Sequence, residues 1–252
     1  MLKSTFLHIP GITEKTEINL WKNNISSWDD FLNNYDLIDL KENKKNLIYN
    51  YLNSSNENYI KKNHSFFSKT LPSNNHWRAY KDFSVCFLDI ETTGLSKNYN
   101  EITTIGLYDG KKSRVFVNGI DMHNFLKEIS KYGVIVTFNG KTFDIPFIEH
   151  KFKINLNQIH IDLRYLLKKF GFCGGLKKIE KDMGIIRNDD LSEVNGLEAV
   201  RLWKRYKRGD KNALTKLIEY NKADIENLKI LMDFAFTKAK NECFCNFCIN
   251  TK

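Results

Sequence analysis

Two carboxylates, Asp89 and Glu91, end an apolar run that begins at Val85. A Thr-Thr-Gly turn follows the run, and this pattern predicts a buried strand over residues 85–90. Side chains alternate between the two faces of a strand, so both acids point the same way. Two acids on one face of an apolar strand repel each other and resist burial. A divalent cation removes both objections, because it prefers oxygen ligands and supplies positive charge.

A third acid, Asp144, lies where a predicted strand over 134–138 gives way to a predicted helix. Aspartate is a favourable helix N-cap, and Pro146 fits the first turn, so one interpretation of Asp144 is a cap. The edge of the sheet where strands hand over to helices is also where α/β folds bind ligands. A second interpretation, compatible with the first, therefore places Asp144 in a functional site.

A fourth acid, Asp224, lies in a strong helical pattern over residues 211–240. Tyr220 precedes it by four residues, so the two side chains share one face of the predicted helix. Taken alone, such a pair is typical of exposed polar positions on an amphipathic helix. Its interest comes from its place after the two acidic segments already described.

The three segments resemble the motifs of a known family. The run Asp-Ile-Glu-Thr-Thr-Gly-Leu from residue 89, the Asn139 to Phe143-Asp144 spacing and the Tyr-x-x-x-Asp pattern at 220–224 are similar to those of the Asp-Glu-Asp-Asp 3′–5′ exonucleases. That family is a group within the ribonuclease H-like superfamily. Residue 219 is glutamate where the histidine subgroup needs histidine, so the chain resembles the tyrosine subgroup. Segments at 66–78, 174–177 and 196–203 also resemble uncharacterised prokaryotic ribonuclease H-like domain proteins.

The resemblance implies a nuclease site that holds two catalytic metal ions. It assigns Asp89, Glu91, Asp144 and Asp224 to the ions. Tyr220 is expected to orient or to help activate the attacking water, and an ordinary tyrosine pKa of about 10 favours orientation over proton abstraction at pH 7. All-oxygen ligation favours Mg²⁺ or Mn²⁺ over zinc, and two such ions clamp a phosphodiester. The residues expected to bind the nucleic acid are Thr92, Asn139 and Phe143.

The elements that must position these residues are predicted in a ribonuclease H-like order. Strands over 85–90, 101–108 and 113–118, with the turn signal Asp109-Gly110, predict an antiparallel meander. A helix over 121–131, the strand over 134–138 and then mainly helices follow. The predicted fold is therefore α/β, with a mixed sheet, flanking helices and a small N-terminal helical segment. Asp162 is expected to cap a helix over 163–170.

The chain is expected to divide into three parts. Residues 1–65 form a helical segment, and residues 53–69, rich in asparagine and lysine, predict a linker or a poorly packed connection. Residues 10–16 resemble the turn of helix-hairpin-helix modules, which faces a DNA phosphate; simple packing on the main domain is the alternative. Residues 66–240 form the nuclease domain, where Trp77 and neighbouring phenylalanines are expected to pack into the core. Residues 241–252 form a frayed tail whose thiols are ordinary or bind a metal: Cys243, Cys245 and Cys248.

Composition fits a nucleic-acid partner. The net charge is +9, and a basic surface attracts phosphates. The chain contains no apolar run of about 18 residues, so no membrane helix is expected. It also lacks an apolar leader core, and its five cysteines do not resemble a disulfide framework, so a cytoplasmic location is expected.

The resulting hypothesis is a metal-dependent 3′–5′ exonuclease that acts on a single-stranded 3′ end of DNA or RNA. One alternative is a catalytically silent nucleic-acid-binding or scaffold protein, and another is a structure-directed endonuclease. The complete set of four acids and Tyr220 argues against the silent alternative, because a degenerate member is expected to have lost at least one of them. The sequence leaves open whether the substrate is DNA or RNA, whether cleavage starts at an end or inside the strand, and what the oligomeric state is.

Overall fold

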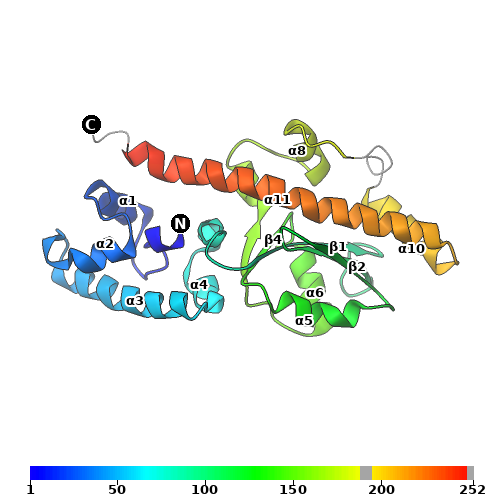
Figure 1. The fold of residues 1–252 in the computed structure, drawn as a ribbon, viewed down its shortest axis with the longest axis horizontal. Helices are drawn as coiled ribbons and strands as arrows, with labels where there is room; N and C mark the ends of the chain where they lie inside the picture. Colours follow the sequence, from blue (N-terminus) through cyan, green and yellow to red (C-terminus); the bar gives the residue numbers. More distant parts are fainter. Residues whose placement is uncertain (188–194, 249–252) are drawn as a thin grey trace.

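A five-stranded mixed sheet lies at the centre of the protein in the computed structural model (Figure 1). The structure describes residues 1–187 and 195–248, and the side chains of residues 1–187 and 195–243. Among these residues no helix is both long and apolar enough to cross a membrane. The elements before the sheet are η1 (Leu2–Ser4), α1 (Glu14–Lys22), α2 (Trp28–Asn33), η2 (Tyr35–Leu37), α3 (Glu42–Ile60), α4 (His64–Thr70) and η3 (Ser73–Ala79).

The sheet has the strand order β3-β2-β1-β4-β5. Its first three strands form the predicted antiparallel meander, and β4 and β5 are added parallel to β1. The α/β fold with a mixed sheet and flanking helices is therefore confirmed. The elements are β1 (Val85–Thr92), β2 (Ile102–Tyr108), β3 (Ser113–Val117), η4 (Met122–Asn124), α5 (Phe125–Ile129), β4 (Val134–Thr137), α6 (Asp144–Phe152), β5 (Ile159–Asp162), α7 (Leu163–Lys168), α8 (Leu176–Asp182), α10 (Gly196–Lys207) and α11 (Lys211–Cys248).

Helices cover both faces of the sheet, and β1 divides its side chains between them. Leu88 and Ile90 pack in a core with α5 and α6, whereas Phe87 packs in a second core with Ile225 and Leu228 of α11. The long helix α11 runs along the sheet, while α5 and α6 lie on its other side (Figure 1). Because strand side chains alternate, the odd-numbered residues of β1 face α11.

One strand was absent from the sequence prediction. Residues Ile159–Asp162 form β5, which pairs in parallel with β4. Only Ile159 and Ile161 of these four residues are buried, because His160 and Asp162 face the other way. Two apolar positions are too few to reveal a strand by periodicity.

The expectation of a linker over residues 53–69 is wrong. Helix α3 extends to Ile60 and α4 begins at His64, so most of this stretch is helical. Ile48, Leu52 and Ser55 form the buried face of α3 at helical spacing. The abundant asparagine and lysine side chains occupy the remaining, solvent-facing positions, which is why composition alone suggested a connection.

The N-terminal segment shares its core with the sheet. Phe6, Trp28 and Phe31 are fully buried in the cluster that also contains Phe87 and Ile225. Trp77 and Phe67 belong to the same cluster, so the prediction that these aromatic residues pack in the core is confirmed. The segment before Pro10 holds only the three-residue η1, and Thr13 caps α1 through the backbone N–H of Thr16.

Residues 241–248 are helical where a frayed end was expected, because α11 continues to Cys248, and the rest of the predicted tail lies outside the described residues. Cys243 lies beside Arg78, whose Nη2 is 3.9 Å from Sγ. Cys245 and Cys248 are in the helix, but their side chains lie outside the described residues.

Candidate active site

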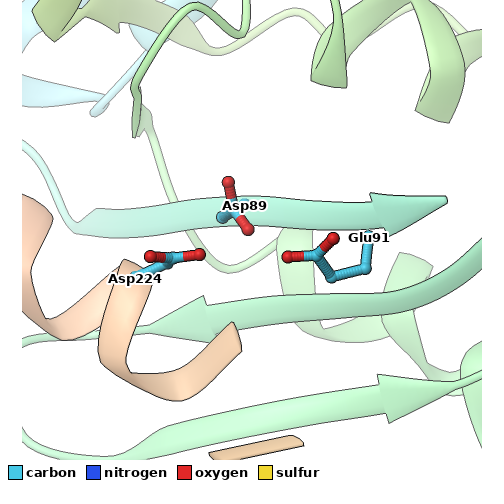
Figure 2. Close-up of side chains that lie close together, drawn as sticks. All are labelled: Asp89, Glu91 and Asp224. Atoms are coloured by element: carbon cyan, nitrogen blue, oxygen red, sulfur yellow. The ribbon is translucent and has the colours of Figure 1, made fainter. Parts of the chain in front are cut away.

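Three of the four predicted acids meet between β1 and α11. Carboxylate oxygens of Asp89, Glu91 and Asp224 all lie within 4.8 Å of one another, and Figure 2 shows the three side chains together. Asp89 and Glu91 occupy odd positions of β1, the positions that face α11. Asp224 precedes Ile225, which anchors α11 to the sheet. Alternation in the strand and packing of the helix thus bring the acids together.

The fourth acid, Asp144, lies beside this group but outside it. Its side chain is 3% exposed, and Oδ1 accepts a hydrogen bond of 3.0 Å from the backbone N–H of Ile90. Phe143 is the N-cap position of α6, and Asp144 is the first residue of the helix. Asp144 is therefore not the N-cap of α6, and the capping interpretation is wrong. Its carboxylate instead fixes the end of β1 between the two catalytic candidates of that strand.

Asp162, by contrast, has a purely structural set of contacts. Its carboxylate accepts hydrogen bonds from the backbone N–H groups of Asn139, Lys141 and Arg164. The last of these caps α7, so the predicted cap is confirmed. With three backbone donors on its two oxygens, Asp162 holds the β4–α6 connection in place.

Asn221 was missed by the sequence analysis, although it carries a clear signal. It is fully buried, and its Nδ2 lies 2.8 Å from Oδ2 of Asp89. Gly106 of β2 makes room for it, since a Cβ there would lie 2.7 Å from the Asn221 Oδ1. The signal is its position, because Asn221 is a polar residue in the apolar stripe of α11, one turn before Asp224.

A cleft of about 580 Å³ opens beside Glu91. All three predicted substrate-binding residues, Thr92, Asn139 and Phe143, line it. The Asn139 side chain is held by Arg164, whose Nη1 donates to Oδ1 at 2.7 Å. Two prominent apolar side chains also line the cleft, Leu95 (87% exposed) and Leu197 (74% exposed). The cleft therefore joins the acidic group to a surface with both polar and apolar contacts.

Comparison with known proteins identifies the family. A family model described as RNase_H superfamily matches residues 86–236, which include all four acids. The chain belongs to the RNase H superfamily. It is also 31% identical over 168 residues to the uncharacterized protein MJ0365 of Methanocaldococcus jannaschii, and the match covers 58% of this chain and 94% of that protein.

Three solved structures are similar to this superfamily member at low identity. RNase D of Escherichia coli, an exoribonuclease involved in structured RNA processing, is 19% identical, with a TM-score of 0.43 over 68% of this chain and 47% of that one. Brucella melitensis NrnC with bound Mg²⁺ is 16% identical, with a TM-score of 0.44, and the match covers 65% of this chain and 80% of the NrnC chain. The family B DNA polymerase of Pyrobaculum calidifontis is 16% identical, with a TM-score of 0.47. That match covers 62% of this chain and 24% of the polymerase.

In this RNase H superfamily member the acids destabilise one another. Burial is the largest cause that raises the pKa of Asp89 and of Glu91 well above the usual range, and the charges of Asp224 and Asp144 add to it. Burial also raises the pKa of Asp144 to about 7 and that of Asp224 to about 6. A group of carboxylates that resists ionisation near neutral pH is the electrostatic setting in which a bound cation has the largest effect.

Two cations from the α8 region balance part of this charge. Arg187 forms ion pairs with Asp224 at 2.5 Å and with Glu180 at 2.6 Å. The Lys177 ammonium lies 5.2 Å from the ring centre of Tyr220. No pattern in the sequence singled out Arg187, because its partner Asp224 is distant along the chain.

Tyr220 lies one helical turn before Asp224 and is 7% exposed. Burial, and then the nearby charge of Asp224, raise the pKa of Tyr220 above its usual range. The phenol is therefore protonated at neutral pH, so its O–H can donate a hydrogen bond but does not readily act as a base.

The raised pKa of Asp144 gives a testable pH dependence. In the unfolded chain the group ionises near its ordinary value of 3.8, whereas the folded protein keeps the proton until about pH 7. Stability of the metal-free parent relative to Asp144→Asn should therefore fall as pH rises from about 4 to about 7, by about 1.4 kcal/mol per pH unit.

Calorimetric unfolding of both proteins in EDTA measures this difference. His8 and His160, whose pKa values burial lowers to about 3 and about 4, titrate over an overlapping range. They are present in both proteins, so their effect cancels in the difference. A stability difference that does not change with pH would contradict the raised pKa.

Proposed function

We propose that the chain is a metal-dependent nuclease that hydrolyses phosphodiester bonds of DNA or RNA, and that it works as a 3′–5′ exonuclease of the tyrosine subgroup. The observation that carries the proposal is the meeting of Asp89, Glu91 and Asp224 within 4.8 Å, from a strand and a helix far apart in sequence. Membership of the RNase H superfamily supports it.

The donor set fits hard divalent cations. Asp89, Glu91 and Asp224 offer only carboxylate oxygens, and Asp144 adds another carboxylate beside them. Oxygen ligands suit Mg²⁺ and Mn²⁺, whereas zinc sites usually contain histidine or cysteine. The raised pKa values of the four acids fit the same conclusion, since a cation restores the ionised form that burial opposes. When bound, two such ions supply the activation of the attacking water and the stabilisation of the leaving oxygen.

The protein's own groups orient the reactants around these acids. Asn221 holds the Asp89 carboxylate through Oδ2, and the Ile90 N–H holds Asp144, so both carboxylates have fixed directions. Tyr220, protonated and one turn from Asp224, donates a hydrogen bond that orients the attacking water. It does not remove a proton from that water, because its pKa is raised.

The cleft beside Glu91 has the chemistry of a nucleotide site. Thr92 and Asn139 provide polar groups, while Phe143 and the exposed Leu95 provide apolar surface for a base. A terminal nucleotide placed there would bring its phosphodiester next to the acids.

The test is digestion of 5′-labelled single-stranded DNA and RNA with Mg²⁺, Mn²⁺ or EDTA. The proposal predicts a metal-dependent ladder that shortens from the 3′ end, and the better substrate identifies the sugar that is recognised. Internal fragments would instead establish the endonuclease alternative. Binding without cleavage of either nucleic acid would contradict the nuclease proposal and establish the silent binding protein.

Replacement of Tyr220 by phenylalanine should slow cleavage by about 100-fold, because the water loses a hydrogen-bond donor but the metal ligands remain. Mn²⁺ affinity, measured by calorimetry, should be unchanged. Tyr165→Phe is the matched control, since Tyr165 is an exposed tyrosine of α7. Equal rates for Tyr220→Phe and the parent would remove Tyr220 from the mechanism.

A further inference from the structure

Arg187 occupies an unusual position, because a candidate metal ligand is its ion-pair partner. Its side chain is 6% exposed, and Nη2 lies 2.5 Å from Oδ1 of Asp224. Nε and Nη2 also donate to the two oxygens of Glu180, each at 2.6 Å. The guanidinium thus lies between a structural acid and an acid of the metal-binding group.

Glu180 and Asp224 fix the guanidinium from two helices. Glu180 of α8 is 2% exposed, and its Oε1 also accepts a hydrogen bond from Asn227 of α11 at 3.0 Å. The Nη1 atom of Arg187 is buried as well, but it has no hydrogen-bond partner in the described part of the chain. The two carboxylates therefore determine where Arg187 lies, and the two N–H donors of Nη1 have no acceptor among residues 1–187 and 195–243.

We propose that Arg187 is the counter-cation of Asp224 in the metal-free protein, and that it exchanges this carboxylate for a phosphate of the nucleic acid when metal and substrate bind. The inference rests on the proposed function, since it concerns the same site. It makes Arg187 a substrate-binding residue and couples metal loading to the presence of substrate.

Electrostatics explains why the exchange is required. A guanidinium 2.5 Å from an Asp224 oxygen places positive charge beside a carboxylate that would hold a divalent ion, and like charges in a buried site repel strongly. Arginine binds phosphate through paired N–H groups, so a substrate phosphate can replace Asp224 as its acceptor. Nη2, once it leaves Asp224, and Nη1, which moves with it, are the donors for that contact.

The first test is Mn²⁺ affinity without nucleic acid, measured by calorimetry or by the electron paramagnetic resonance of free Mn²⁺. Arg187→Gln should bind Mn²⁺ about tenfold more tightly than the parent, because the competing cation is gone. Arg205→Gln is the matched control. It makes the same substitution in a 58% exposed arginine of α10 that pairs with Asp210, and its affinity should equal that of the parent.

Loss of Arg187 alone leaves the Glu180 carboxylate buried and unpaired, which threatens folding. The double variant Glu180→Gln/Arg187→Gln removes both charges, keeps the net charge constant and should show the same gain in affinity. Unchanged or weaker Mn²⁺ binding in both variants, with normal binding by the parent, would overturn the role of Arg187 alone. Failure of all the proteins, parent included, to bind Mn²⁺ would overturn the proposed metal centre as well.

The second test measures the coupling to substrate. A short phosphorothioate oligonucleotide, which retains the phosphate charge but resists cleavage, should strengthen Mn²⁺ binding to the parent. The same oligonucleotide should strengthen binding to Arg187→Gln several-fold less, because that protein has no competing cation to remove. Equal strengthening in the two proteins would contradict the exchange of partners.

Discussion

Asp89→Asn should abolish metal-dependent cleavage and, at the same time, make the metal-free protein more stable. The substitution removes a proposed metal ligand, so the rate should fall by about 10³-fold, as it does when a key group that stabilises transition-state charge is lost. It also removes a carboxyl group whose pKa is raised by burial and then by Asp224, Asp144 and Glu91, so folding no longer has to protonate this group. Nucleic-acid binding should remain, because the sheet stays folded.

Initial cleavage rates in Mn²⁺ and melting temperatures in EDTA measure both effects at pH 7.5. A gain in stability of 1 kcal/mol would raise the melting temperature by about 2–4 °C in a chain of this size. Asp182→Asn is the control, since Asp182 is a partly exposed acid that pairs with Lys178 at the end of α8. An Asp89→Asn protein that cleaves as fast as the parent would refute the two-metal assignment.

Asp144→Asn should reduce cleavage by about 10²-fold or more, although Asp144 lies outside the group of three acids. Its Oδ1 already accepts from the Ile90 N–H, and the amide oxygen of asparagine can keep that contact. The other oxygen, which asparagine replaces by an NH₂ donor, is the one available to a metal ion. Charge and ligation are therefore lost while the end of β1 stays in place.

Asp162→Asn provides a sharp control for this prediction. Asp162 lies at the end of the neighbouring strand β5, but its oxygens accept backbone N–H groups of Asn139, Lys141 and Arg164. Its replacement should lower stability by about 1 kcal/mol and leave the Mn²⁺ requirement unchanged. If Asp162→Asn lost activity and Asp144→Asn kept it, the assignment of the metal-directed role to Asp144 would be contradicted.

Much of the fold and of the acidic group follows from local sequence. The run from Val85 predicts β1 because its residues are mainly apolar and a turn follows it. Strand alternation then places Asp89 and Glu91 on one face. The helical period over 211–240 predicts most of α11 and the shared face of Tyr220 and Asp224. Each of these predictions depends on neighbours within one turn or one strand.

The features that sequence analysis missed depend on contacts between distant residues. Arg187 meets Asp224 across 37 positions, and Asn221 meets Asp89 across 132. The asparagine in the apolar stripe of α11 marks position 221, but no local pattern identifies the partner of either residue. The helical stretch mistaken for a linker has a different cause. A narrow buried face, formed by Ile48, Leu52 and Ser55, stabilises α3 despite its polar composition, because the segment packs on the common core.

The most direct test of the central claim is anomalous diffraction from crystals of the protein soaked in Mn²⁺. A two-metal nuclease should show two peaks about 4 Å apart, ligated by Asp89, Glu91, Asp144 and Asp224. The Arg187 guanidinium should have moved away from Asp224 wherever a nucleotide phosphate is also bound. Crystals that bind Mn²⁺ elsewhere, or that leave Asp224 paired with Arg187 and show no peak at the acids, would contradict the account.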